Sequence, residues 1–208
     1  MNKRGDYKVI DDYFPDWLIK LVSIEMTLIP MKWDNTPRKD SFKDCRFLGN
    51  MILIEDYWQL PDVNNWFADY LIKCIHHDIC KEYGITNTVR ILHNGQFALK
   101  DDSMNGINHR DSEYNNYLSL IYMGHGNSGD TVILDKDNKE HRISFKEGRM
   151  VIFNSNTLHR GEAPTSGYRA SWGLVFPLFD PTGVRLNDSM IDPNVKDTAW
   201  YKREMPTD

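Results

Sequence analysis

The stretch that decides the fold runs from Tyr117 to Phe153 and reads YLSLIYMGHGNSGDTVILDKDNKEHRISFKEGRMVIF. Short runs of β-branched and aromatic residues in it are separated by turn residues, among them 126–129 (Gly-Asn-Ser-Gly) and 146–148 (Lys-Glu-Gly). Runs of this length between such turns predict β-strands. Several short strands at this spacing are typical of a sandwich or a jelly-roll barrel.

The same pattern of short strand-like runs continues on both sides of this stretch, whereas the first part of the chain has helical patterns. The predicted strands are Thr88–Leu92, Tyr117–Met123, Thr131–Leu134, Glu140–Phe145, Arg149–Phe153 and Tyr168–Leu178. One helix is predicted from Asp16, as the capping residue, to about Leu28, and a longer one from Pro61 and Asp62 to Gly84. Helices first and strands after predict an α+β fold in which the helices buttress one face of the strands.

The chain of 208 residues is the right size for one domain with a substantial core. We expect a single domain over residues 1–208, with mainly helical support in 1–87, a β-barrel core in 88–179 and a tail in 180–208. The polar stretch 34–44 is predicted to be a loop.

Composition argues against several classes of partner. The formal net charge is −5, with 25 Lys and Arg against 30 Asp and Glu, so the surface has no general attraction for nucleic acid or anionic membranes. No run approaches the roughly 20 apolar residues that span a bilayer, and no signal peptide is recognisable. Three cysteines, Cys45, Cys74 and Cys80, make a poor disulfide framework. We therefore expect a cytoplasmic protein with reduced thiols, and the oligomeric state stays open.

Four residues in the second half of the chain have the spacing of a metal site with a neighbouring anion site. His109 and Asp111 lie two residues apart, and in extended backbone such side chains share a face. His159 follows 48 residues after Asp111. Two imidazoles and one carboxylate on one side of a metal suit non-haem Fe(II) and oxygen. Arg169, ten residues beyond His159, would offer a guanidinium to a dicarboxylate, with Ser171 on the same face.

A second His-x-Asp motif, His76-His77-Asp78, lies within the longer predicted helix. At 100° per residue, positions i and i+2 of a helix point about 200° apart and cannot hold one ion. The nearby Cys74 and Cys80 could suggest zinc together with His77, but Cys74 belongs to the apolar stripe of that helix. We therefore predict no metal there.

The stretch from His109 to Phe176 resembles the core of the Fe(II)- and 2-oxoglutarate-dependent oxygenases, especially their prolyl 4-hydroxylase-like branch. About a third of the chain carries the resemblance. Five landmarks occur in the family order: His109-Arg110-Asp111, Ile121-Tyr122-Met123-Gly124, Ser128-Gly129-Asp130-Thr131, Glu147 to Phe153 leading into Leu158-His159, and Arg169-Ala170-Ser171. One departure is Ser128, where the family turn has its first glycine.

The resemblance implies a double-stranded β-helix of the jelly-roll or cupin-like kind. His109, Asp111 and His159 would ligate Fe(II). Arg169 would pair with the distal carboxylate of 2-oxoglutarate.

Three further residues match co-substrate contacts in related enzymes. Tyr122 matches a tyrosine that hydrogen-bonds the same carboxylate, Thr131 matches a co-substrate-facing threonine, and Ser171 would support Arg169. With O₂, and with ascorbate as an optional support, such an enzyme would hydroxylate a peptidyl or small-molecule substrate and release succinate and CO₂.

Three alternatives remain beside this reading. A barrel that binds metal and 2-oxoglutarate without turnover, as a sensor or binding module, would share all the ligands. A cupin-type isomerase or hydrolase with another metal would leave Arg169 without a purpose. Halogenases of this superfamily lack the carboxylate ligand, whereas Asp111 is present.

Overall fold

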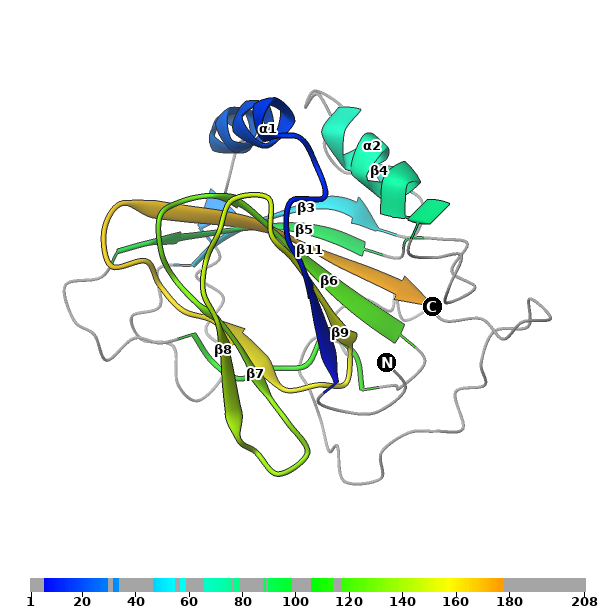
Figure 1. The fold of residues 1–208 in the computed structure, drawn as a ribbon, viewed down its shortest axis with the longest axis vertical. Coiled ribbons are helices and arrows are strands. Elements are labelled where there is room, and N and C mark those ends of the chain that lie inside the picture. The colour runs from blue at the N-terminus through cyan, green and yellow to red at the C-terminus, as the bar shows by residue number, and fades with distance from the viewer. Residues whose placement is uncertain are drawn as a thin grey trace, which may run out of the picture.

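Two antiparallel sheets and two helices make up the part of the chain that the computed structural model describes, namely residues 6–29, 32–33, 47–54, 57–58, 66–75, 77–78, 88, 90–98, 106–113 and 117–177 (Figure 1). The large sheet has the order β1 (Tyr7–Ile10), β9 (Met150–Asn154), β6 (Tyr117–His125), β11 (Tyr168–Pro177), β5 (Arg90–Phe97), β3 (Phe47–Ile54) and β2 (Lys32–Trp33), with β4 (Tyr57–Trp58) paired to β3. The small sheet has the order β10 (His159–Gly161), β7 (Thr131–Leu134) and β8 (Glu140–Ile143). The two sheets are separate among these residues, so the β-barrel core that was predicted for 88–179 does not close into a barrel.

The two faces of the large sheet have different neighbours. Side chains alternate across a strand, so Leu120 and Tyr122 of β6 point to one face while Ile121 and Met123 point to the other. The first pair belongs to a core shared with the helices, and the second packs with Ile133 of the small sheet. The space between the two sheets is therefore separate from the core under the helices. The candidate site lies in this space.

Helix α1 (Asp16–Leu28) confirms the first predicted helix. Its N-cap is Pro15 rather than Asp16, because the Pro15 carbonyl accepts the first helical hydrogen bonds from the amides of Leu18 and Ile19. No side-chain cap forms, and Asp16 lies in the first turn, where a negative charge opposes the helix dipole favourably. Leu18 and Val22 of α1 are buried against the large sheet.

Helix α2 (Trp66–Ile75) lies within the second predicted helix, on the same face of the large sheet as α1 (Figure 1). Phe67 and Leu71 are buried there, and the Phe67 ring packs against Trp172 of β11 at 5.3 Å between centroids. The expected ends of this helix, 61–65 and 79–84, lie outside the described residues, as do the loop 34–44 and the tail 180–208. Neither described helix is long and apolar enough to cross a membrane.

All six predicted strands are confirmed, as β5, β6, β7, β8, β9 and β11. Several strands were not predicted, and in the first half of the chain β1 and β3 add to the large sheet beside the helices that were expected there. β1 pairs with β9, for example Tyr7 opposite Phe153. Such pairing joins segments far apart in sequence, and a four-residue edge strand with little burial carries no alternating pattern.

Candidate metal and co-substrate site

Three metal-ligand side chains converge between the two sheets. Ligand atoms of His109, Asp111 and His159 all lie within 4.8 Å of one another, and among the described residues they are the one such group of three. Paired backbone hydrogen bonds of 2.9 Å between His109 and His159 hold the two segments together. Asp111 is fixed by its amide, which donates to the carbonyl of Ser155 at 3.0 Å. The predicted triad is therefore assembled by the backbone.

The orientation of both imidazoles suits metal binding. Nδ1 of His109 lies 3.0 Å from the carbonyl oxygen of Ile107, and Nδ1 of His159 lies 3.0 Å from that of Thr157. A carbonyl oxygen only accepts, so each Nδ1 carries the proton. With Nδ1 of each ring donating to a carbonyl, Nε2 is the nitrogen that faces the other two ligand side chains and can bind a metal once it is unprotonated. Nε2 of His159 lies 3.6 Å from Oδ2 of Asp111, too far for a hydrogen bond but close enough for both atoms to bind one ion.

Asp111 is surrounded by groups that stabilise its charged form. Arg90 of β5 donates from Nη2 to Oδ1 at 2.7 Å, and Ser119 of β6 donates to Oδ2 at 2.7 Å. Burial alone would raise the pKa of this carboxyl, but the charges of His159, Arg90 and His109 and the Ser119 hydroxyl outweigh it. The pKa of Asp111 therefore lies below its ordinary value, and the group is an anionic ligand.

Arg90 is a functional residue that the sequence did not reveal. It lies on a predicted strand, but only the register of that strand brings it to Asp111. Because Arg90 engages one carboxylate oxygen, it favours metal binding through the other and holds Asp111 in one orientation. We expect Arg90→Ala to weaken Fe(II) binding about 10- to 100-fold, as loss of an outer partner does at other metal sites. Arg90→Lys should lie between, since lysine keeps the charge without the guanidinium geometry.

The measurement is Fe(II) affinity by competition with a chromophoric chelator under anaerobic conditions. Arg149→Ala is the matched control, because Arg149 forms an ion pair with Asp11 at 2.7 Å near the surface of the large sheet. Equal affinities for Arg90→Ala and the control would show that Arg90 does not support the ligand.

Arg169 of β11 is buried without a carboxylate partner among the described residues. Its guanidinium donates to three neutral oxygens: Oε1 of Gln96 at 2.9 Å, Oγ1 of Thr131 at 3.0 Å and the carbonyl of Glu162 at 3.3 Å. Only 3% of its surface is exposed. Burial lowers its pKa to about 10, against the opposing charges of Asp130 and Glu162. A buried cation with neutral partners alone is costly, so this position favours an anionic ligand.

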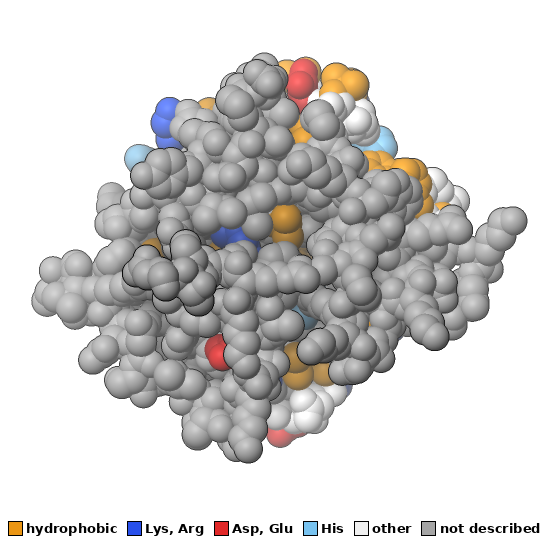
Figure 2. All heavy atoms as spheres, turned by 180° about the vertical axis from the view of Figure 1, so that it is seen from behind, with side chains coloured by type: hydrophobic (Ala, Val, Ile, Leu, Met, Phe, Trp, Pro, Cys, Tyr) orange, Lys and Arg blue, Asp and Glu red, His pale blue; other side chains and the backbone are white. Residues whose placement is uncertain are grey.

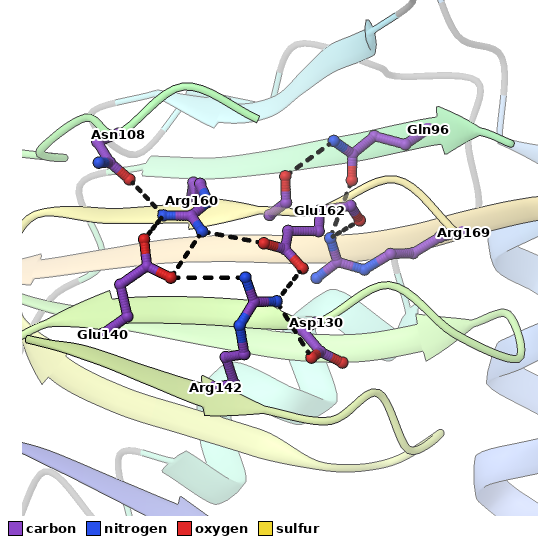
Figure 3. A network of polar contacts seen from close by, with 9 residues as sticks. Gln96, Asn108, Asp130, Glu140, Arg142, Arg160, Glu162 and Arg169 are labelled. Carbon is purple, nitrogen blue, oxygen red and sulfur yellow. Dashed lines mark hydrogen bonds and ion pairs between the residues drawn. The ribbon is translucent and has the colours of Figure 1, made fainter. Parts of the chain in front are cut away.

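The carboxylates nearest to Arg169 are engaged elsewhere (Figure 3). Glu162 accepts from Arg142 at 2.6 Å and from Arg160 at 3.0 Å, and Arg160 also binds both carboxylate oxygens of Glu140. Arg160 follows His159 directly and also donates to Asn108, the residue before His109. The network therefore anchors both histidine-bearing segments and leaves Arg169 available.

Two glycines keep room around Arg169. Gly161 lies two residues after His159 on β10, and a Cβ added there would come within 2.5 Å of Nη1 of Arg169. Gly129 has a φ of +97°, and a Cβ there would lie 2.9 Å from Cδ of Arg169. Gln96 clamps this region, since its Nε2 donates to the Gly161 carbonyl at 3.2 Å while its Oε1 accepts from Arg169. Seen from behind, basic, hydrophobic and histidine side chains are visible near the centre of this face (Figure 2).

The prediction that Tyr122 contacts the co-substrate is wrong. Tyr122 belongs to the core under the helices, where its ring lies 5.4 Å from that of Phe67 and 6.4 Å from that of Phe14. Ser119, which contacts Asp111, lies three residues earlier on β6, so the alternation of the strand puts Tyr122 on the opposite face. The motif placed the strand correctly but not this side chain.

We expect Tyr122→Phe to leave 2-oxoglutarate affinity unchanged. The Tyr122 hydroxyl is buried and has no hydrogen-bond partner among the described residues. Burial, helped by the nearby Glu147, raises its pKa, so the group stays neutral. Removing an unsatisfied buried hydroxyl should leave the free energy of unfolding equal or raise it by about 1 kcal/mol. Urea unfolding and 2-oxoglutarate titration check both statements, and a tenfold loss of affinity would restore the original assignment.

Thr131 and Ser171 lie in the neighbourhood that was predicted for them. The Thr131 hydroxyl accepts from Arg169, and Ser171 is buried two residues along the same strand. Ala170 and Trp172 belong to the core under the helices, so Ser171 shares the other face with Arg169. Their contact with a co-substrate stays a prediction.

The competing motif is outside this site. His77 and Asp78 are exposed and contact each other at 2.6 Å, while His76 and Cys80 lie outside the described residues. Cys74 is a free thiol. Neither His77 nor Asp78 joins a group of three metal-ligand side chains among the described residues.

Solved structures of oxygenases share this fold. A Pseudomonas putida prolyl-4-hydroxylase is 13% identical, with a TM-score of 0.57 over 85% of this chain and 94% of that one. A Trichoplax adhaerens prolyl hydroxylase in complex with a hypoxia inducible factor peptide is 14% identical, with a TM-score of 0.61 over 83% and 84%. HygX from Streptomyces hygroscopicus, with nickel and 2-oxoglutarate bound, is 10% identical, with a TM-score of 0.59 over 85% and 84%.

At these identities the likeness establishes the fold. Neither a family model nor a curated protein matches the sequence. The fold is that of the Fe(II)/2-oxoglutarate oxygenases, including prolyl-hydroxylase-like ones, in agreement with the motif resemblance.

Proposed function

We propose that the chain is an Fe(II)- and 2-oxoglutarate-dependent dioxygenase that hydroxylates a primary substrate. Iron would be held by His109, Asp111 and His159, and the distal carboxylate of 2-oxoglutarate by Arg169. When bound, iron and 2-oxoglutarate would supply the activation of O₂, with one oxygen atom going to the substrate and the other to succinate as CO₂ is lost. The two sheets would be those of a double-stranded β-helix within a single domain.

The observation that carries the proposal is the buried guanidinium of Arg169. A metal triad alone would fit a hydrolase or an isomerase. The chemistry of such an enzyme does not require a buried guanidinium like that of Arg169, which donates only to neutral oxygens. A dicarboxylate placed between the metal and Arg169 would satisfy both, because one end can bind the ion and the other can accept two charge-assisted hydrogen bonds.

The residues around the site hold this geometry in place. The carbonyls of Ile107 and Thr157 fix the imidazoles, and Arg90 fixes Asp111. Gly161 leaves the approach to Arg169 unfilled. Charged ligands in a buried site need such fixed partners, since water no longer solvates them.

The primary substrate stays open between a peptide and a small molecule. Proteins of this fold include a prolyl hydroxylase solved with a peptide fragment and HygX solved with hygromycin B. Specificity depends on the segments over the site. The candidates, which are the loops 34–44 and 101–108 and the tail after Asp180, lie wholly or mostly outside the described residues.

Formation of succinate tests the function. Protein loaded with Fe(II) should convert 2-oxoglutarate to succinate and CO₂ in the presence of O₂ and ascorbate, slowly without substrate and faster with it. Incubation with a cell lysate should then identify the substrate by a mass gain of one oxygen atom. Tight binding of metal and 2-oxoglutarate without any succinate would favour the non-catalytic binding module.

A further inference from the structure

The outward face of α1 exposes four large apolar side chains. Trp17, Leu21, Ile24 and Leu28 are 67%, 39%, 60% and 69% exposed, and they are half of the eight exposed large hydrophobic residues in the described part of the chain. The opposite face of the helix is already buried against the large sheet. Viewed from behind, hydrophobic side chains gather at the upper edge of the molecule, over the helices (Figure 2). We call these four residues the outer stripe.

The spacing of the outer stripe is that of a coiled-coil seam. Its members follow one another at intervals of four, three and four residues. These intervals are those of successive d, a, d and a positions of a heptad, which face a partner helix. A contiguous exposed apolar strip of this kind marks an interaction surface.

Two charged residues beside the outer stripe indicate what the partner is. In this heptad frame Lys20 occupies a g position and Glu25 the next e position, on opposite flanks of the stripe. In a parallel pair of identical helices, a g residue of one helix meets the following e residue of the other. Lys20 would therefore meet Glu25 of the partner subunit. Two such ion pairs would form, because each helix supplies one Lys20 and one Glu25. In an antiparallel pair, g residues face g residues and e residues face e residues, so Lys20 would not meet Glu25.

These charges are not used within the described part of the chain, where neither Lys20 nor Glu25 forms an ion pair. Helix α1 is thus self-complementary in both its apolar seam and its charges. A second copy of the chain is the partner that satisfies both.

We propose that the protein forms a homodimer in which α1 helices of two copies pack side by side in parallel. Helix α1 lies on the side of the large sheet opposite the small sheet, so dimerisation leaves the metal site accessible (Figure 1). Thirteen residues make a helix about 20 Å long, which is a small interface. The dimer is therefore in equilibrium with the monomer and depends on concentration.

Sedimentation velocity of the full chain over a concentration series tests the proposal. Wild type should shift from monomer to dimer, and Ile24→Glu should remain monomeric. Lys20→Glu and Glu25→Lys should each weaken the dimer roughly tenfold, because each replaces two attractions by two repulsions. The double variant K20E/E25K should return to wild-type affinity. Lys136→Glu, the same charge change on the turn between β7 and β8, is the control and should have no effect. Circular dichroism verifies that each variant is folded.

Several outcomes would overturn the proposal. A wild type that stays monomeric at the highest concentration would mean that something else covers the outer stripe, such as residues 178–208. A dimer unaffected by Ile24→Glu would place the interface elsewhere. A dimer whose affinity Lys20→Glu and Glu25→Lys leave unchanged would indicate an antiparallel pair, in which these two residues do not meet.

Discussion

Replacing His159 with alanine will remove iron from the protein and abolish 2-oxoglutarate turnover. His159 is 3% exposed, and its backbone is paired with that of His109. Loss of the imidazole removes one of three ligands and leaves the half-buried carboxylate of Asp111 beside the space that the ring occupied. His109→Ala and Asp111→Ala should have the same effect, because ligation by all three is needed to hold a labile divalent ion. Iron content and succinate formation are the measurements.

His77→Ala is the matched control, since His77 belongs to the competing motif and is exposed. It should leave both iron content and turnover at wild-type levels. Full iron occupancy in a folded His159→Ala protein would contradict the assignment. Loss of iron in folded His77→Ala would transfer the metal site to the other motif.

Replacing Arg169 with alanine will leave iron bound but raise the concentration of 2-oxoglutarate needed for half-saturation tenfold to more than a hundredfold. This range corresponds to about 1.5–3 kcal/mol for a hydrogen bond to a charged group. Arg169→Lys should lie between, because lysine keeps the charge but cannot donate two parallel hydrogen bonds. The measurements are iron content, which should not change, and the apparent affinity for 2-oxoglutarate.

Two controls separate the loss of the anion contact from a loss of packing around Arg169. Arg149→Ala removes a half-buried arginine whose ion pair with Asp11 does not belong to the network around Arg169, and should change affinity little. Gly161→Val should resemble Arg169→Ala, because its side chain would occupy the space beside the guanidinium. Unchanged affinity in both Arg169 variants would make Arg169 structural and leave the co-substrate without its anchor.

The sequence predicted the residues of the site better than their surroundings. His109 and Asp111 converge because two residues of extended backbone share a face, and this follows from local geometry alone. Arg169 and His159 were found from their order and spacing. Tyr122 was misplaced by the match to the family motif, because one position along β6 decides between the face toward the small sheet and the core under the helices.

Other features required the register of the sheets. Arg90 contacts Asp111 only because β5 runs beside β11 in the large sheet. Gln96 contacts Gly161 across the space between the sheets, a pairing of residues 65 positions apart. β1 joins the opposite edge through pairing with β9. Gly161 did have a local signal, a residue without a side chain two positions after a ligand, which could have marked the space beside Arg169.

The outer stripe of α1 shows that an apolar pattern does not tell which face of a helix is buried. Five apolar residues lie near helical spacing in the helix predicted from Asp16 to about Leu28, namely Trp17, Leu18, Leu21, Val22 and Leu28. Leu18 and Val22 are buried, whereas the other three face outward. The hydrophobic pattern predicted the helix but could not say that it has two apolar faces, since only the packing of the helix reveals which one is covered.

Equilibrium binding of 2-oxoglutarate to the anaerobic protein, with and without Fe(II), tests the central claim most directly. A calorimetric titration should show one 2-oxoglutarate per chain in the iron-loaded protein, much weaker binding in metal-free wild type and in His159→Ala, and a large loss in iron-loaded Arg169→Ala. This pattern would show that one ligand bridges the metal triad and Arg169. Equal binding with and without iron, or equal binding by wild type and Arg169→Ala, would contradict the account.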